Sequence, residues 1–482
     1  MQSYHVQERI QRDASSKLNV IVVGAGLGGL GAAIGILLAG HDVTVLESAA
    51  AIGEVGAGIQ VLPNSARVLF AWGLKDKLEP FATWPRKCNF ISWKGKHLSE
   101  MDYHAYTQGA GGPFMDFHRA NLHKCLLDRA VELGAALITS ARVVDVEING
   151  DEATEATVVL IDGRRMTADL VVGADGINSR LREVLLGRAD PPVLTGDLAY
   201  RLLLKTDAML KDPELRPLVQ DPQVNYWVGP DAHAVNYVLR GGELFNMVLL
   251  VPDDMPPEGA STATGTVDEM RALYHDWDPR ISKLLSLCDD TAEVTKWRLC
   301  IRPSLEPTWS HPSGALTLLG DAVHATLPYL ASGAGMAVED GGVLGLCLAR
   351  LQDTSSASKQ QALRIYEECR RERTERIVAR GSYNQHMYHL HDGPEQEARD
   401  QRFQDFAEAD RKWMSDPGFV LPVTNETGED PFPWRYHGVG RWLLTYDMER
   451  DVLARWPVHA EDAKDAQEVV RLQESMPIRA SI

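Results

Sequence analysis

The sequence predicts an α/β fold with two separate sheets, and three observations support this prediction. The β-branched run Leu18–Val23, the small apolar segment Leu27–Leu38 and the strand-like run Asp42–Leu46 have the pattern of a β-α-β unit. After about residue 190 the pattern changes to short alternating runs separated by turn residues, which is typical of an antiparallel sheet. These runs are Leu198–Lys205, Val224–Val228, Ala234–Leu239 and Leu244–Val251. Helical patterns at Gly335–Leu351 and Gln360–Arg380 predict a helical region toward the C-terminus.

The composition limits the class of protein. The 482 residues are 44% hydrophobic and 24% charged, which suits packed domains rather than a disordered chain. The net charge of −18 disfavours nucleic acid and anionic membranes as partners, because both are polyanions. Six cysteines show no zinc-binding spacing, so we expect reduced thiols, no metal site and a cytoplasmic location. The segment Leu18–Leu38 is long enough to cross a membrane, but its six glycines follow a nucleotide-binding pattern, and we expect no stable span.

A glycine-rich fingerprint lies between the first strand and the first helix. Gly24, Gly26 and Gly29 form the pattern G-x-G-x-x-G. In this pattern the first glycine makes a tight turn, the second lets a pyrophosphate approach the backbone, and the third lets helix and strand pack closely. Glu47 ends the next strand, where a carboxylate can accept hydrogen bonds from ribose hydroxyls. The order of strand, glycines, helix, strand and acidic residue favours a Rossmann-type dinucleotide site over a Gly-rich turn with a solvent-facing Glu47. This order does not show whether the dinucleotide is FAD or NAD.

Two further segments bear on the choice of cofactor. Asp175-Gly176 and Gly320-Asp321 each follow a buried strand-like run and precede a helical one. In this order and spacing after Gly24, they resemble the motifs of the single-component flavoprotein aromatic hydroxylases. The most similar branch is that of salicylate hydroxylase, with fungal phenol hydroxylases among its relatives, and the resemblance covers about residues 18–385.

The resemblance implies an FAD-dependent monooxygenase that uses NADPH or NADH and O2. Such an enzyme hydroxylates a small aromatic, phenolic substrate through a flavin C4a-hydroperoxide, and the substrate can be carboxylated as in salicylate. The family has no second dinucleotide-binding domain, and this sequence has no second complete fingerprint. The oligomeric state is left open.

The resemblance also assigns cofactor-binding roles by position. Glu47 would bind the ribose, Arg119 the ribityl or phosphate region and Asp321 the ribityl chain. Asp175 would help to shape the FAD site and the nicotinamide approach. The complete set of expected cofactor-binding residues is Gly24, Gly26, Gly29, Glu47, Gly58, Arg119, Asp175, Asp321, Ala334 and Gly335.

Several of these positions have a second, structural interpretation. Arg119 can be an ordinary arginine at a helix start, and Asp321 can be a helix cap. The small residues around Ala334 and Gly335 allow close contact with a flat ring, and the helix start would favour negative charge on the reduced flavin. The same small residues also suit tight helix packing.

The antiparallel sheet is expected to form the substrate pocket. Arg201 and Tyr237 are the best positional matches to the arginine and tyrosine that bind the phenolate in fungal relatives, and we assign them as catalytic. His233, Arg240 and Asn246 are further substrate-binding candidates. Strand periodicity places Ala199 with Arg201 on one face, and His233, Val235 and Tyr237 on one face. Each of these side chains can instead face solvent, and His324 is expected to be a packed core histidine.

The predicted organisation has four parts. They are a flexible N-terminus (1–17), a discontinuous FAD-binding domain (18–190 and 300–390), a substrate-binding sheet domain (191–299) and a helical or irregular C-terminal segment (391–482). Two alternatives to aromatic hydroxylation stay open. One keeps the flavin chemistry but performs a dearomatising hydroxylation or an epoxidation in fungal secondary metabolism. The other is a non-enzymatic module with this fold, such as the prenyl-GTPase escort proteins.

Overall fold

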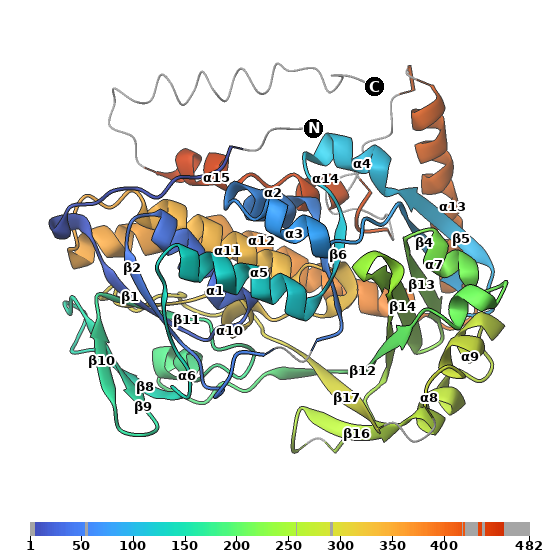
Figure 1. Cartoon of the computed structure of the whole chain (residues 1–482), viewed down its shortest axis with the longest axis horizontal. Helices are drawn as coiled ribbons and strands as arrows, with labels where there is room; N and C mark the ends of the chain where they lie inside the picture. The colour runs from blue at the N-terminus through green and yellow to red at the C-terminus, as the bar shows by residue number, and fades with distance from the viewer. Residues whose placement is uncertain are drawn as a thin grey trace.

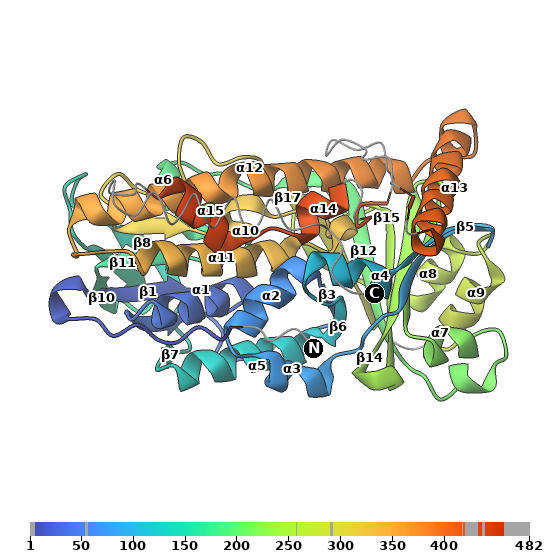
Figure 2. The same cartoon turned by 90° about the horizontal axis from the view of Figure 1, so that it is seen from above.

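The computed structural model describes residues 5–53, 56–256, 258–289, 293–416, 418–419, 432–435 and 439–456. The molecule is elongated, with a parallel α/β part and a large mixed sheet toward opposite ends of its long axis (Figure 1). The helix α12 (Ser356–Tyr388) runs along this axis and reaches both parts (Figure 2). The predicted α/β fold with a Rossmann-type domain and an added antiparallel sheet is confirmed.

A five-stranded parallel sheet forms the core of the α/β part. Its strands are, in order, β18 (Leu316–Leu318), β11 (Leu170–Gly173), β1 (Asn19–Val23), β2 (Asp42–Leu46) and β7 (Ala136–Ile138). Helices cover one face, namely α1 (Leu27–Leu38), α5 (Arg119–Glu132) and α11 (Gly333–Leu348). A small antiparallel sheet packs on the other side, with strands β10 (Arg165–Ala168), β9 (Ala156–Leu160) and β8 (Val143–Glu147). The carboxyl end of β1 therefore leads directly into the glycine-rich turn and α1.

The second sheet has eight strands. In order they are β16 (Thr262–Thr266), β17 (Glu293–Ile301), β12 (Val193–Lys205), β15 (Leu244–Pro252), β14 (Ala232–Leu239), β13 (Gln223–Gly229), β4 (Lys87–Ser92) and β5 (His97–Asp102). One face packs on α8 (Val267–Leu273) and α9 (Pro279–Leu285) through the even-numbered residues of β12, such as Leu198 and Leu202. Strand alternation therefore turns the odd-numbered residues of β12 to the opposite face.

The remaining elements connect and cover the two sheets. The strands β3 (Gly58–Val61) and β6 (Met115–His118) form a short antiparallel pair. The other helices are α2 (Pro63–Ala71), α3 (Lys75–Leu78), α4 (Tyr103–Ala110), α6 (Arg180–Leu186), α7 (Arg216–Gln220), α10 (Asp321–His324), α13 (Pro394–Ser415), α14 (Val439–Leu444) and α15 (Met448–Arg455). Short 3-10 turns are η1 (Ala14–Ser16), η2 (Glu79–Phe81), η3 (Met209–Lys211), η4 (Arg240–Gly242) and η5 (Pro328–Leu330). The described part of 391–482 is thus mainly helical, and much of the segment lies outside the described residues.

Two predicted boundaries differ from the structure. The N-terminal segment, predicted to be flexible, is held against the α/β part over residues 5–17. There the Arg12 guanidinium donates hydrogen bonds to the backbone carbonyls of Leu348, at the end of α11, and of Leu351, just beyond this helix. The eight-stranded sheet also takes β4 and β5 from the range predicted for the FAD-binding domain, because β4 pairs in parallel with the distant β13. Within the part of the chain that the structure describes, no helix is both long enough and apolar enough to cross a membrane.

Candidate functional site

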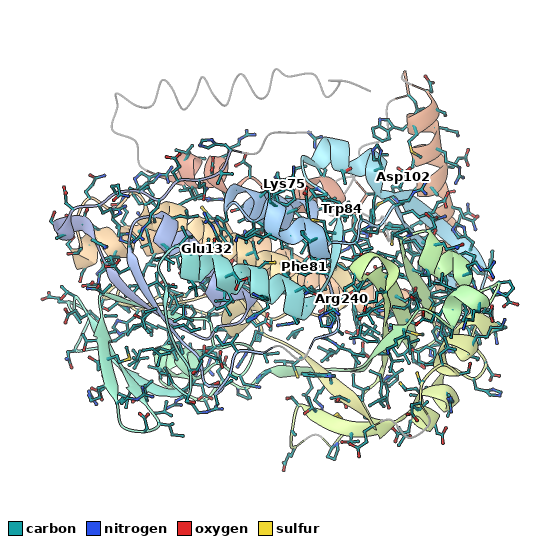
Figure 3. All side chains as sticks on the ribbon, viewed as in Figure 1. Lys75, Phe81, Trp84, Asp102, Glu132 and Arg240 are labelled. Carbon is teal, nitrogen blue, oxygen red and sulfur yellow. The ribbon has the colours of Figure 1, made fainter. Side chains whose placement is uncertain are left out.

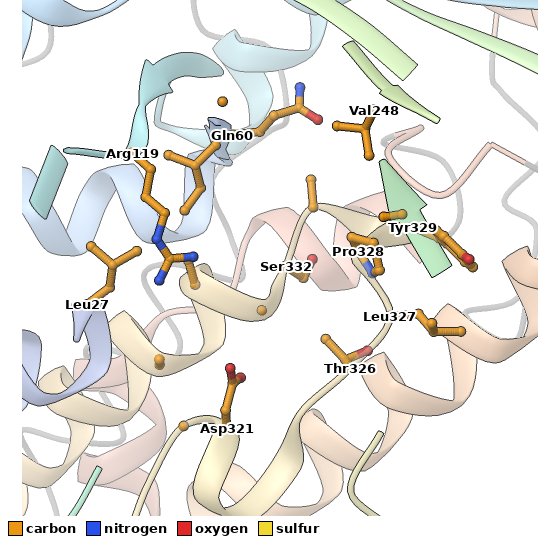
Figure 4. Close-up of a pocket in the computed structure, with 18 of the residues that line it drawn as sticks. Leu27, Gln60, Arg119, Val248, Asp321, Thr326, Leu327, Pro328, Tyr329 and Ser332 are labelled. Carbon is orange, nitrogen blue, oxygen red and sulfur yellow. The ribbon is translucent and has the colours of Figure 1, made fainter. Parts of the chain in front are cut away.

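A cavity of about 360 Å³ lies between the glycine-rich turn and the eight-stranded sheet. Its walls come from the start of α1, β3, the start of α5, the strands β12 to β15, and the segment from β18 to α11. Figure 4 shows Arg119 and Asp321 entering this space from opposite sides. Of the predicted site residues, those that line the cavity are Gly26, Gly58, Arg119, Arg201, His233, Tyr237, Asp321 and Ala334.

The glycine-rich turn has the geometry of a dinucleotide cradle. Gly24 has a φ of +105°, and a Cβ on it would lie 2.4 Å from the carbonyl oxygen of Ala174. A Cβ on Gly29 would lie 1.9 Å from the carbonyl oxygen of Gly24, so the helix can start only this close to the strand without a side chain there. A Cβ on Gly26 would meet no atom within 4 Å, and Gly26 lines the cavity. The turn therefore keeps open the space where a pyrophosphate approaches the backbone.

Glu47 lies behind this turn rather than in the wall of the cavity. Its carboxylate accepts hydrogen bonds from the backbone N–H groups of Ala25 at 3.0 Å and Ala49 at 2.8 Å. Burial acts to raise the pKa of Glu47, but these backbone hydrogen bonds outweigh it and lower the pKa below its ordinary value. Glu47 is thus a half-buried carboxylate that is hydrogen-bonded to the glycine-rich turn, and not a solvent-facing side chain. This position suits ribose binding.

The Gly320-Asp321 turn presents a carboxyl group to the cavity. The Asp321 side chain is exposed to the cavity, but desolvation by the protein around it raises its pKa, whereas His324 and Arg119 act to lower the pKa. Asp340 on α11 holds the turn, because its Oδ2 accepts a hydrogen bond from the Gly320 N–H at 2.9 Å. The same carboxylate contacts His324 Nε2 at 2.6 Å and accepts from Arg370 at 2.8 Å. Burial opposes ionisation of Asp340, but His324 and Arg370 bring its pKa to about 2.

His324 is buried, as a packed core histidine would be, but it also contacts Asp340, which holds the Gly320-Asp321 turn.

Asp175 supports a neighbouring turn. Its carboxylate accepts hydrogen bonds from Ser179 Oγ at 2.5 Å and from the backbone of Arg180 at 2.7 Å, at the start of α6. The residues on either side of it, Ala174 and Gly176, line the cavity, whereas Asp175 does not.

Two neighbouring residues of α11 that were both predicted to contact the cofactor, Ala334 and Gly335, have different surroundings. Ala334 lines the cavity, as the ring-contact interpretation requires. A Cβ on Gly335 would be 3.4 Å from Ser65 Oγ on α2, and Gly335 does not line the cavity. The helix-packing interpretation therefore fits Gly335, and contact with a flat ring fits Ala334.

The sheet supplies the opposite wall of the cavity. Strand register places Arg201, Val248 and Val235 side by side on β12, β15 and β14. The next row along the same face is Ala199, Leu250 and His233. All six residues line the cavity. This face is therefore largely apolar, with one arginine and one histidine.

Arg201 is a half-buried cation in this wall. Its Nε has no hydrogen-bond partner among the described residues, and none of their carboxylates forms an ion pair with it. Burial and the positive charge of Arg119 lower its pKa, while Tyr237 acts to raise it. A guanidinium stays charged in proteins, so an unpaired one is costly unless an anion binds it.

Tyr237 packs directly against β3. A Cβ on Gly58 would lie 2.5 Å from the Tyr237 ring, so this position has no room for a side chain. The Gly58 N–H donates to Asn246 Oδ1 at 2.7 Å, which fixes the strand against the sheet. Burial raises the pKa of Tyr237, so its hydroxyl remains a hydrogen-bond donor. Asn246 does not line the cavity, and the structure gives it a positioning role behind Gly58.

Arg240 does not reach the cavity. Strand β14 ends at Leu239, and Arg240 begins the turn η4 with a φ of +51°. This backbone turns the exposed side chain away from the sheet face, where its Nε donates to Asn121 Oδ1 at 3.2 Å. Figure 3 shows Arg240 near the start of α5, at the opposite end of this helix from Glu132. The structure thus gives no support to a substrate contact by Arg240.

Several polar residues of the cavity wall lie outside the predicted site. These are Gln60, Tyr226, Thr326, Tyr329 and Ser332. Gln60 lies two residues after Gly58, and three of the others follow the Gly-Asp motif within about a dozen residues, so both motifs could have been extended along the chain. Tyr226 enters only through the pairing of β13 with β14, which no short motif reveals.

Comparison with known proteins decides the family. Residues 17–381 match the sequence model described as FAD binding domain. The chain belongs to this FAD-binding family. It is 41% identical to the FAD-dependent monooxygenase OpS4 of Beauveria bassiana over 87% of this chain and 94% of that protein. It is 32% identical to the 3-hydroxybenzoate 6-hydroxylase of Polaromonas naphthalenivorans over 78% of this chain and 90% of that protein. This flavoprotein is accordingly an FAD-dependent monooxygenase.

Solved structures agree with this assignment. Klebsiella pneumoniae HpxO, in a complex with FAD and uric acid, is 27% identical with a TM-score of 0.67 over 80% of this chain and 93% of that chain. A salicylate hydroxylase substrate complex has a TM-score of 0.71 over 93% of this chain and all of that chain. At 22% identity the second likeness shows the shared fold.

Proposed function

We propose that this monooxygenase hydroxylates a small phenolic substrate that carries an anionic group, with NADPH or NADH as reductant and O2 as co-substrate. One observation supports this proposal most strongly: the Arg201 guanidinium, which has no carboxylate partner among the described residues, lies in the apolar sheet wall opposite the dinucleotide cradle. An arginine there offers a planar pair of donors to a carboxylate or phenolate.

The residues of the cradle suit FAD. Gly26 leaves the backbone at the start of α1 open to a pyrophosphate, and Glu47, a carboxylate bonded to the N–H of Ala25 in this turn, would bind the ribose. Arg119 and Asp321 face the cavity from opposite sides. When bound, FAD supplies electron transfer from the nicotinamide and activation of oxygen. The protein's own part is to bind the aromatic ring, exclude water and set the charge of the substrate.

The residues of the sheet wall would bind the aromatic ring and set the charge of the substrate. Val235 and Val248 flank Arg201 and present an apolar surface to a flat ring. The Arg201 charge lowers the pKa of a phenol bound beside it, because an opposite charge favours the ionised form. The Tyr237 hydroxyl can donate a hydrogen bond to the same oxygen. A phenolate is more electron-rich than a phenol, so these contacts favour attack on electrophilic oxygen.

The test is a screen for substrate-stimulated oxidation of NADH and NADPH by the FAD-loaded protein. The panel pairs anionic phenols, such as 3-hydroxybenzoate and 3-amino-4-hydroxybenzoate, with phenol itself. We expect the anionic members to stimulate oxidation and to yield a product heavier by one oxygen atom in mass spectrometry. Equal stimulation by neutral phenol, or none by any phenol, would contradict the proposal.

A second candidate keeps the flavin chemistry but performs a dearomatising hydroxylation or an epoxidation in fungal secondary metabolism. It is favoured by the 41% identity to a fungal monooxygenase, against 34% for the 3-amino-4-hydroxybenzoate 2-monooxygenase of Streptomyces cremeus. A dearomatised or epoxidised product from a fungal phenol, in the absence of any simple hydroxybenzoate product, would select this candidate.

A further inference from the structure

A tryptophan side chain lies at the rim of the cavity, on the same face of the eight-stranded sheet as Arg201. Trp297 on β17 is directly opposite Ala199 on β12 in the strand register. Residues directly opposite each other in paired strands point to the same face, and Ala199 lines the cavity. Trp297 is 38% exposed and does not itself line the cavity. The indole therefore lies just outside the cavity, beside the wall that contains Arg201.

The alternation of side chains along β17 supports this orientation. Lys296 and Arg298 point to the opposite face, where their side chains are 8% and 3% exposed and form ion pairs with carboxylates. Leu299 and Ile301 share the face of Trp297, and both are partly buried against the hydrophobic cluster that also supplies residues of the cavity wall. Trp297 is therefore the exposed end of an apolar stripe that follows β17 along the cavity side of the sheet.

The indole forms a cation–π contact with the arginine of the sheet wall. The Arg201 Cζ lies 5.7 Å from the ring centroid, within the range of about 6 Å for such a contact. Ala199 lies between Trp297 and Leu250 in one row of the sheet and contributes only a methyl group to that row. The short Ala199 side chain therefore leaves space beside the indole for a flat group.

A single exposed tryptophan is ordinary on a protein surface, and Trp84 is an example. Trp84 is 43% exposed and does not line the cavity. Two features distinguish Trp297 from it. Trp297 lies on the face of the sheet that forms the substrate wall, and it contacts a cation that has no carboxylate partner among the described residues.

We propose that Trp297 is a specificity-determining residue that stacks on a second flat ring of the substrate. This inference rests on the proposed function, because it takes the phenolic ring and its anionic group to lie beside Arg201. The substrate class that it names is a hydroxylated aromatic acid with a fused or directly linked second ring. Such a ring would extend from the wall at Arg201 over Ala199 to the indole.

The size of the cavity and the chemistry of the indole both support this class. The cavity of about 360 Å³ would also have to hold the flavin end of FAD, so a substrate with two rings would extend to the rim. Contact with a second ring would remove apolar surface of the indole from water, and aromatic pairs are more favourable than the burial of the same area alone. Arg201 would meet both the anionic group and the indole, which joins recognition of charge to recognition of the ring.

The test compares ligands that share one anionic group and differ by one ring. Salicylate carries adjacent hydroxyl and carboxylate groups on a single ring, and 1-hydroxy-2-naphthoate and 3-hydroxy-2-naphthoate carry them on two fused rings. Isothermal titration calorimetry with the full-length FAD-loaded protein gives the dissociation constants. We expect at least one naphthoate to bind about tenfold more tightly than salicylate, and Trp297→Ala to remove most of this advantage. Salicylate affinity should fall by no more than about fivefold, the size of one exposed cation–π contact.

Two variants serve as controls for this comparison. Trp297→Phe keeps an aromatic face at the rim and should retain a large part of the naphthoate advantage. Trp84→Ala removes a tryptophan of similar exposure that does not line the cavity, and it should retain the whole advantage.

The outcomes that would overturn the inference are distinct from failure of the proposed function. Salicylate binding without any naphthoate advantage in the wild type, or an advantage that persists in Trp297→Ala, would show that the second ring does not meet the indole. An equal loss of affinity for salicylate and the naphthoates in Trp297→Ala would show that Trp297 only supports Arg201. Failure of the wild-type protein to bind any of the three ligands would overturn the proposed function, and the role of Trp297 with it.

Discussion

The two walls of the cavity are built in different ways. The cradle side comes from short contiguous motifs, in which Gly26 and Asp321 each follow a parallel strand at its carboxyl end. The sheet side comes from residues of separate strands, so that Arg201 and Val235 become neighbours only through the register of β12, β15 and β14. Local turns fix the first wall, and long-range pairing fixes the second. Substitutions in the first should change cofactor retention, and substitutions in the second should change substrate use.

The largest effect is expected from Gly26→Leu. A Cβ at this position meets nothing within 4 Å, so the protein should fold, but a leucine side chain would fill the space needed by the pyrophosphate. FAD affinity should fall by about a hundredfold, or about 3 kcal/mol. Equilibrium dialysis with FAD would measure the affinity, and thermal unfolding of the apoprotein would monitor the fold. The smaller Gly26→Ala variant is the control and should retain most of its FAD.

Arg201→Ala tests the other wall. Loss of a charge-assisted bond to a bound anion costs about 1.5–3 kcal/mol, so KM should rise or coupling should fall by tens of fold. FAD content should stay normal, and oxidation of the nicotinamide should continue with release of peroxide. Product formed per nicotinamide consumed, with peroxide assayed in parallel, gives the coupling.

Conservative variants sharpen this prediction for Arg201. Arg201→Gln should be nearly as impaired as the alanine variant, because the argument depends on charge. Arg201→Lys should recover part of the coupling, since a point charge does not reproduce a planar fork. Wild-type KM and coupling in Arg201→Ala would show that the side chain does not meet the substrate.

The difference between the walls also explains what the sequence could predict. The fingerprint at Gly24, Gly26 and Gly29 and the Gly-Asp turn were identifiable because each is a local pattern with a local geometric cause. Strand alternation alone placed Arg201 with Ala199, and His233 with Tyr237, on shared faces.

What the sequence could not predict depends on long-range pairing. The parallel pairing of β4 with β13 joins residues that are far apart in the chain, so the domain limit at 190 missed two strands. The contact of His233 with His389 depends on where the long helix α12 ends. Arg240 was misplaced for a local reason, because a residue just past a strand end can leave its face.

Asp321→Ala should have an intermediate effect, on the cofactor alone. The side chain faces the cavity, and loss of one hydrogen bond to the cofactor should weaken FAD retention by about tenfold. The turn itself is held by Asp340 through the Gly320 N–H, so the fold should change little. Flavin content after gel filtration would measure retention. Unchanged content would remove Asp321 from the cofactor site.

The smallest effect is expected from Arg240→Ala, which is the matched control for Arg201→Ala. Both substitutions remove one arginine from the region of the eight-stranded sheet. Arg201 lies within β12 and lines the cavity, whereas Arg240 follows the end of β14, is exposed and bonds to Asn121 outside the cavity. An exposed hydrogen bond of this kind contributes little, and surface substitutions usually change stability by no more than about 0.5 kcal/mol. KM, coupling and FAD content should therefore stay within about twofold of wild type, a difference of about 0.4 kcal/mol. Steady-state kinetics and product analysis under the conditions used for Arg201→Ala would measure these quantities. A loss of coupling in Arg240→Ala equal to that in Arg201→Ala would mean that the two arginines act through a shared long-range charge, and the assignment of the anion site to the Arg201 side chain would be wrong.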